Sequence, residues 1–474
     1  MHKRMVAIGA LAILTGCAVG PDYEKPATPA PTGFNAAHRN GDFDQAEQRF
    51  WQGFDDPLLA RLIDRTLDAN QTLKGAMARY ERAAALLDSA EQDRWPSVTA
   101  SATAAETHPA AVERTPAGTG PERVETYRTG VAATWELDFF GRLRRATQAQ
   151  RAELAAAGAD VGALQVALTG QVASSYFRLR GLQAQYRVTE QNVALQATSL
   201  EIVDARVHAG RGTAFDRVRA RAQLERTRAE LPTLQAGIRA AMHRIAVLTG
   251  QPPAALIETL APRKPLPASL PTIPVDSPGE LLRRRPDIAA AERRLAAATA
   301  RIGVATADLF PRFTLGGLLG SVAANTGDLF SGPAESRRIA LGVDWTFLDR
   351  ARVRARIDAA DATGREALAE YRQTVLTALE ETETRLERYH RSRQRVRRLR
   401  QAEQDARQAV ELARTRYERG LIAYFEVLDA EQALTTTRDA AVRSRMAATL
   451  AMVDVYRALA GAPREPVDAV AAAE

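Results

Sequence analysis

The chain repeats itself once, and this internal repeat limits its possible folds more than any other feature of the sequence. The segment 416–432 reads RYERGLIAYFEVLDAEQ, and 206–223, which begins 210 positions earlier, reads RVHAGRGTAFDRVRARAQ. Gly210 and Gly420 stand at the same place in the two copies, between stretches of helical periodicity. Two helical hairpin tips of one design imply a chain built from two copies of one unit.

The N-terminus carries an export signal. Lys3 and Arg4 precede the apolar run 5–14, which is too short to remain as a spanning helix. The run ends in L-T-G-C at Cys17, the only cysteine, which is the lipobox pattern of bacterial lipoproteins. We therefore expect cleavage before Cys17 and acylation there, with a chance cysteine in an ordinary signal as the alternative. Ala18, in place of the aspartate that commonly retains such lipoproteins in the inner membrane, favours the outer membrane.

The basic charge of the chain does not indicate nucleic-acid binding. The net charge is +7 and the pI is near 9.7. The segment 391–400 holds six arginines, but no aromatic residue is interleaved with them, and the chain is exported. Nucleic-acid recognition needs stacking or base-reading groups in the basic patch. We expect a solvated helix face there and no nucleic-acid partner.

The sequence lacks the residue patterns by which the common classes of enzyme are recognised. No Gly-rich phosphate loop and no nucleophile elbow occurs in the sequence. The histidines are scattered without the spacing of metal ligands: His2, His38, His108, His208, His243 and His390. We therefore predict no catalytic site, no metal and no cofactor.

Two segments alternate with a period of two, which is typical of strands. In 97–139, apolar and aromatic positions from Tyr127 to Phe139 alternate with more polar, acid-bearing ones. The segment 312–347 repeats this plan, and Trp345 follows Trp135 by 210 positions. Strands of about ten residues with aromatics near one end are typical of a membrane β-barrel. The hairpin of a soluble sandwich, which alternates in the same way, is the alternative.

Two very long helices follow these hairpins. No proline interrupts 141–209 or 350–461, and the first stretch alone would reach roughly 100 Å as a helix. An ordinary coiled coil is the alternative explanation for their alanine-rich composition. The predicted organisation is a signal peptide (1–16), an acylated tether (17–56), a first repeat (57–250) with hairpin 97–139 and its tip near 210, a proline-rich connector (251–279), a second repeat (280–460) with hairpin 312–347 and its tip near 420, and a C-terminal tail (461–474).

Four strands per chain cannot close a barrel alone. Open sheet edges are not tolerated in lipid, so the sheet must be shared between chains. Two chains would give eight strands and an interior filled by side chains, whereas three would give twelve strands and an open lumen. We expect an α+β membrane protein, a homotrimer whose twelve-stranded barrel continues into a tube of long periplasmic helices.

The combination of a lipobox, two strand hairpins and two long helical hairpins resembles one known family. These are the outer-membrane factors of tripartite, RND-type efflux pumps, the TolC-like channels, and especially their OprM/NodT-like lipoprotein branch. The lipobox followed by A-V-G-P-D-Y (18–23) is similar to the N-terminal signature of that branch. The pattern R-Y…G…L-D-A between 416 and 430 is similar to the second hairpin tip of the family. The resemblance implies a passive trimeric duct in the outer membrane, joined through a periplasmic adaptor to an inner-membrane pump. The connector and the tail would belong to an equatorial domain.

The resemblance also implies a gate at the periplasmic tips. Phe425 would form an apolar constriction, Asp429 an acidic ring, and Glu426 a further acid with Asp216 as its first-repeat counterpart. Tyr417 and Arg206 would link the helices that hold the tube shut. Capping or solvent exposure near a turn is the alternative for these acids. The adaptor-contacting tips would comprise Gly210, Arg211, Gly212, Gly420, Leu421 and Ile422. The first tip departs from the family pattern in its two glycines and in Arg217. The resemblance therefore does not identify which residue of this tip contacts the gate.

Two other functions remain to be weighed. The outer-membrane channel of a type I protein-secretion system would have the same fold, although the lipobox favours a small-molecule pump. A periplasmic coiled-coil adaptor lipoprotein would carry one helical hairpin between split soluble β domains, which disagrees with the two hairpins found here. The sequence does not identify the exported compound, because the inner-membrane pump selects it.

Overall fold

The computed structural model describes residues 18–27, 33, 50–114, 121–267 and 283–459. Cys17 with the signal peptide, most of the tether, connector residues 268–279 and the tail 461–474 lie outside these ranges. The chain forms two compact units. Within the described ranges, the sheet unit comprises 18–27, 79–114, 121–157 and 290–372, and the helical unit comprises 33, 50–78, 158–267, 283–289 and 373–459.

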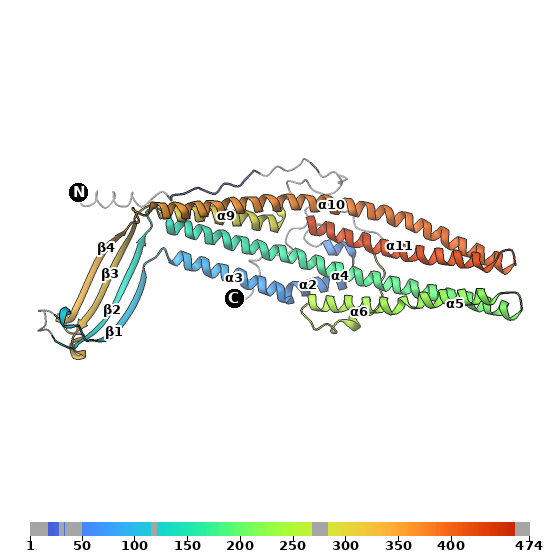
Figure 1. The fold of residues 1–474 in the computed structure, drawn as a ribbon, viewed down its shortest axis with the longest axis horizontal. Coiled ribbons are helices and arrows are strands. Elements are labelled where there is room, and N and C mark those ends of the chain that lie inside the picture. Colours follow the sequence, from blue (N-terminus) through green and yellow to red (C-terminus); the bar gives the residue numbers. More distant parts are fainter. Residues whose placement is uncertain (1–17, 28–32, 34–49, 115–120, 268–282, 460–474) are drawn as a thin grey trace. The chain divides into compact units, whose positions relative to one another are not determined.

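Four antiparallel strands form one sheet in the sheet unit (Figure 1). They are β1 (Ser97–Thr107), β2 (Val124–Leu137), β3 (Arg312–Ala323) and β4 (Glu335–Asp344), in that spatial order. The hairpins of the two repeats meet where β2 pairs with β3, with Trp135 opposite Leu315. Among the described residues, β1 and β4 each pair with one neighbour, so both edges of the sheet are open.

The strand register separates two faces, because side chains directly opposite each other on paired strands point to the same side. What we call the apolar face carries Val98, Ala100, Val131, Ala133, Trp135, Leu315, Leu319, Ile339, Leu341 and Val343. Glu335 and Arg337, at the start of β4, lie on this same side opposite Ser321 and Leu319. The polar face carries Ser97, Thr99, Ser101, Thr103, Arg128, Thr134, Glu136 and Arg338. Ile339 is 87% exposed and Leu319 58% exposed, so the chain alone leaves the apolar face uncovered.

Aromatic side chains fix the base of the sheet, where the helices meet the strands. The Trp135 indole donates to the Arg94 carbonyl at 3.0 Å, and Trp345 donates to the Leu309 carbonyl at 3.1 Å. Phe140 stacks on Phe310 with ring centroids 4.6 Å apart. Both tryptophans therefore bind the turn that leads into a neighbouring strand, and an aromatic cluster closes the end of the sheet.

The segment 18–25 docks against the same base. The Val19 amide donates to the Phe140 carbonyl at 3.1 Å, and the buried Arg145 side chain donates to the Val19 carbonyl at 3.1 Å. Gly20 has φ +90, and a Cβ there would lie 2.4 Å from Gly303 Cα, so only glycine fits. Val19, two residues after Cys17, is therefore hydrogen-bonded to the base of the sheet through both its amide and its carbonyl.

Long helices dominate the rest of the chain. The described helices are α2 (Pro57–Ala69), α3 (Gln71–Gln92), α4 (Arg142–His208), α5 (Ala214–Arg228), α6 (Glu230–Leu248), α7 (Ile257–Leu260), α9 (Pro286–Ala307), α10 (Arg350–Glu418) and α11 (Tyr424–Leu459). Among them, no helix has an apolar stretch long enough to cross a membrane.

The return helix of the first repeat, which follows the first tip, is not continuous. It is divided at Ala229 into α5 and α6, whereas α11 of the second repeat is continuous. Pro232 stands in the first turn of α6 and has no N–H to donate to the preceding turn, which accounts for the break. The second repeat has no proline at the corresponding position.

The described part of the connector is fastened to α4 within the helical unit. The Arg180 guanidinium, which is 2% exposed, donates to the Pro262 carbonyl at 2.7 Å. Gln183 donates to the Leu260 carbonyl at 3.0 Å. Side chains of the long helix thereby satisfy the carbonyls of an irregular segment that lacks ladder partners of its own.

Candidate functional site

The two hairpin tips of the helical unit end their first helices in the same way (Figure 1). Gly210 has φ +67 and Gly420 has φ +75, a left-handed conformation that favours glycine. In each tip the next amide donates to a carbonyl five residues back, at 2.8 Å from Arg211 to Arg206 and at 2.9 Å from Leu421 to Arg416. This paired geometry is a Schellman motif, and it turns the chain sharply in both repeats.

The second helices of the hairpins begin differently. In the first tip, Asp216 and Thr213 form a capping box in which the Thr213 hydroxyl donates to the Asp216 carboxylate at 2.6 Å. The second tip has Ala423 at the capping position, and the Glu426 carboxylate has no partner among the described residues. Asp216 therefore caps α5, while its counterpart Glu426 is exposed on the first turn of α11.

A small hydrophobic core holds the two tips together. It consists of Val203, Ala220, Tyr417, Tyr424, Val427 and Leu428, drawn from α4, α5, α10 and α11. Ile422 packs against this core, whereas the corresponding Gly212 of the first tip lies close to Val207. Burial raises the pKa of the Tyr424 phenol, and the nearby Glu431 carboxylate raises it further. Both effects keep Tyr424 neutral.

Arg206 and Tyr417, the two expected links between helices, lie in contact. The Arg206 guanidinium donates to the Tyr417 carbonyl at 2.8 Å and to the Glu418 carbonyl at 3.2 Å. Its Cζ also lies 3.9 Å from the centroid of the Tyr417 ring. A cation at the last carbonyls of α10 is favoured by the helix dipole, and the ring contact adds a cation–π interaction. Arg206 of the first hairpin therefore caps the long helix of the second.

A buried ionic cluster lies further from the tips. The Ser199 hydroxyl donates to Glu431 Oε1 at 2.5 Å, and the Arg414 guanidinium donates to the same oxygen at 2.7 Å. Glu431 is 1% exposed. Sequence reasoning missed this cluster, although a helical projection could have marked its acid, Glu431, without identifying the partners. Glu431 follows Tyr424 and Leu428 at positions i+7 and i+3, so it is an acid on an apolar face.

The proposed gate residues of α11 share one exposed face. Phe425 is 54% exposed, and Asp429 is exposed one turn further along the helix. Among the described residues, the Asp429 carboxylate forms no hydrogen bond or ion pair. An apolar ring and an acid are thus presented side by side with no contact that neutralises the acid.

An open groove lies between the two tips. Its cavity volume is about 860 Å³, and its walls include Arg206, Arg211 and Gly212 from the first hairpin and Gly420 and Ile422 from the second. Leu421, beside the groove, is 65% exposed. The expected adaptor-contacting residues of both tips are therefore gathered on one surface that carries backbone, basic and apolar groups.

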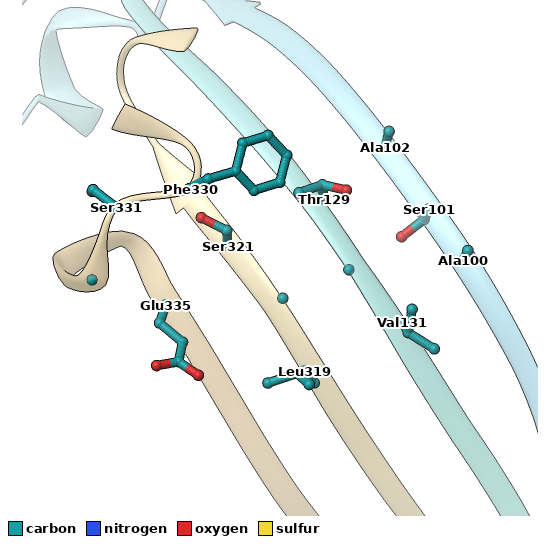
Figure 2. Close-up of a pocket in the computed structure, with 13 residues that line it drawn as sticks. Ala100, Ser101, Ala102, Thr129, Val131, Leu319, Ser321, Phe330, Ser331 and Glu335 are labelled. Atoms are coloured by element: carbon teal, nitrogen blue, oxygen red, sulfur yellow. The ribbon is translucent and has the colours of Figure 1, made fainter. Parts of the chain in front are cut away.

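A second hollow, on the apolar face of the sheet, lacks the features of a binding site. Its cavity volume is about 690 Å³, and Figure 2 shows Phe330, from the turn between β3 and β4, above Thr129 and Ser321. Of the described residues that line it, Glu335 alone is charged, and it is paired with Arg337. Because ligand pockets need several convergent polar groups, we place the functional site at the helical tips.

Comparisons with known proteins agree with this architecture. The chain matches the family described as "Outer membrane efflux protein" over residues 62–251 and 277–461. It is 32% identical to the outer membrane protein OprJ of Pseudomonas aeruginosa over 469 residues, which cover 97% of each chain. It is 29% identical to the toluene efflux pump outer membrane protein TtgI of Pseudomonas putida, covering 97% of this chain and 98% of that one. The solved structure of the outer-membrane channel OprN is 39% identical, with a TM-score of 0.87 and coverage of 94% and 99%.

Proposed function

Because this chain belongs to the outer membrane efflux protein family and is therefore an outer-membrane efflux channel extending into the periplasm, we propose that three copies form the passive exit duct of a tripartite pump. The open four-stranded sheet carries this proposal. It has one uncovered apolar face and two edges without partners among the described residues. Backbone groups at such edges must be paired inside a membrane, and other copies of the chain can pair them.

The number of copies follows from the width of the duct. Eight strands enclose only side chains, whereas twelve leave a lumen. The apolar face would contact lipid, and the polar face with Arg128 and Glu136 would line the lumen. Gly130 of β2 and Gly320 of β3 lie opposite each other on the polar face. Because neither has a side chain there, the sheet can curve strongly toward that face. The long helices would continue the duct as a periplasmic tube.

The gate would lie where α11 leaves the second tip. Three copies of Phe425 would form an apolar ring, and three copies of Asp429 an acidic ring beside it. Glu426 would add acids at the rim, and Asp216 is the acid at the corresponding level of the first hairpin. The contact between Arg206 and Tyr417 would hold the hairpins in their closed arrangement. A ring of like acids attracts cations and repels anions, which makes the constriction selective.

The protein partners would bind at the periplasmic end of the duct. The groove between the tips would receive the periplasmic adaptor, through the surface formed by Gly210, Arg211, Gly212, Gly420, Leu421 and Ile422. The adaptor would join the duct to an inner-membrane RND-type pump that supplies the energy and selects the cargo. Similarity to a toluene efflux protein supports small toxic molecules rather than proteins as that cargo.

Recording from planar bilayers tests the proposal. The purified protein in detergent, added to a bilayer in KCl, should insert and give discrete conductance steps. The steps should be small and should prefer cations, because the acidic ring raises the local concentration of K⁺. Absence of steps from protein that binds the bilayer would reject the duct, and anion preference would reject the acidic constriction.

We also propose that Cys17 is acylated. The structure supports this by docking residues 18–25 at the base of the sheet, where a lipid chain would reach the membrane. We expect the mature protein to begin at Cys17 with a mass increased by its acyl chains. Cys17→Ser should lower sorting to the outer membrane more than insertion, because the barrel is a second anchor. Intact-mass measurement of the outer-membrane fraction checks this prediction, and an unmodified cysteine would refute it.

A further inference from the structure

One arginine of the first hairpin lies between two phenylalanine rings of the tip region. The Arg219 Cζ on α5 is 5.4 Å from the centroid of the Phe215 ring, one turn earlier on the same helix. It is also 5.3 Å from the centroid of the Phe425 ring on α11. Both distances fall within the range of a cation–π interaction. Arg219 therefore connects the return helices of the two repeats through the proposed gate residue.

The internal repeat explains why the two hairpins are complementary at this point. Phe425 corresponds to Phe215, and Asp429 corresponds to Arg219. Each hairpin thus carries a phenylalanine followed one helical turn later by a charged residue, with opposite signs in the two copies. The positive copy can reach across to the aromatic ring of the negative copy. Two identical acidic faces could not make this contact.

Arg219 differs from the nearby Arg217 in the groups that surround its positive charge. Arg217 lies 3.9 Å from the Asp204 carboxylate. Within the described part of the chain, no carboxylate forms an ion pair with Arg219, whose contacts are the two rings. Its positive charge is therefore available to the surroundings of Phe425 and of the Asp429 face.

We propose that Arg219 is the first-hairpin partner of the gate, a positioning residue that holds Phe425 and limits the cation preference of the acidic ring. This inference rests on the proposed gate. Arg219 and Phe215 share α5 and move together, whereas the contact with Phe425 crosses between hairpins. A displacement of α11 relative to α5 breaks only the second contact. Arg219 thus acts as a latch that stays attached to the first hairpin.

Bilayer recordings of three full-length variants test the latch. Arg219→Gln should raise the open fraction about tenfold or more, because each of the three chains loses one exposed cation–π contact and each loss corresponds to a factor of about two to five. It should also shift the reversal potential in a KCl gradient toward stronger cation preference. Arg219→Lys keeps the charge but replaces a stacking guanidinium by a point charge. It should therefore restore the reversal potential while leaving the open fraction raised. The control is Arg221→Gln, which changes an exposed arginine two residues away that contacts no aromatic ring of the described chain.

The outcomes separate the latch from the gate itself. If Arg219→Gln and Arg221→Gln behave alike in both readouts, the latch is wrong. If the Phe425→Ala/Asp429→Ala variant also leaves the conductance unchanged, the gate proposal fails with it. If that double variant raises the conductance and Arg219→Gln does not, only the latch fails. Should Arg219→Gln not assemble, Arg219→Lys decides, because a wild-type open fraction in that variant contradicts a role for ring stacking.

Discussion

Replacement of both Phe425 and Asp429 by alanine should raise the resting conductance of the channel several-fold. The substitution removes the apolar ring that resists hydration and the acidic ring beside it, so the narrowest point widens and loses its charge. Neither side chain is buried, which means that the tip core around Tyr417 and Tyr424 should remain intact. Conductance in planar bilayers and its cation preference are the measurements. Cells that carry the variant should also become sensitive to vancomycin, which is too large for the closed duct.

Glu403 and Arg407 provide a matched control on α10, away from the tip. They form an i,i+4 ion pair at 3.2 Å in which Glu403 is half-buried, and Glu403 also lies 3.9 Å from the Arg438 guanidinium of α11. Alanine at both positions removes the same number of side chains as the gate variant and should change the conductance much less. Equal conductance for the wild type and the Phe425/Asp429 variant would show that the constriction lies elsewhere.

Substitution of Leu319 by arginine should lower the amount of protein that assembles in the outer membrane. Leu319 lies on the apolar face of β3, opposite Val131, and is 58% exposed in the single chain. An arginine on the lipid face of a barrel costs about 2–4 kcal/mol at the midplane and about 0–1 kcal/mol near the interfaces. Because the register places Arg337 of β4 opposite Leu319 on this face, we expect a cost between these limits in each of the three copies. Fractionation of membranes followed by immunoblotting measures the protein that reaches the outer membrane.

Leu318 supplies the control, because it precedes Leu319 on the same strand and points to the polar face. It pairs with Ala132 and Arg338 and would face the lumen. Leu318→Arg therefore adds the same side chain to a wet surface and should be inserted at nearly the wild-type level. Equal loss of both variants would contradict the assignment of the two faces, and normal insertion of Leu319→Arg would contradict a lipid-facing sheet.

Local sequence patterns were sufficient to predict where the main strands, helices and hairpin tips lie in the chain. Alternation with a period of two located the strands, because a sheet with one apolar face requires it. Gly210 and Gly420 located the tips, because each stands at a left-handed position. The absence of proline indicated the continuous α4 and α10. Each of these signals lies within one short stretch of chain.

The contacts that position the candidate site could not be predicted in this way. The Arg219 ring contact and the cluster of Ser199, Arg414 and Glu431 each join residues that are far apart in sequence. Such pairs depend on how the two hairpins are rotated against each other, which periodicity does not specify. The approach of Gly20 to Gly303 is of the same kind, since each glycine alone resembles an ordinary loop or helix glycine.

Native mass spectrometry of the protein extracted from outer membranes in detergent tests most directly whether several copies close one duct. Four strands with open edges require sharing of the sheet, and only three or more copies leave a lumen. We expect a particle of three chains, each beginning at an acylated Cys17. A monomer or a dimer as the sole species would contradict the shared barrel and, with it, the proposed function.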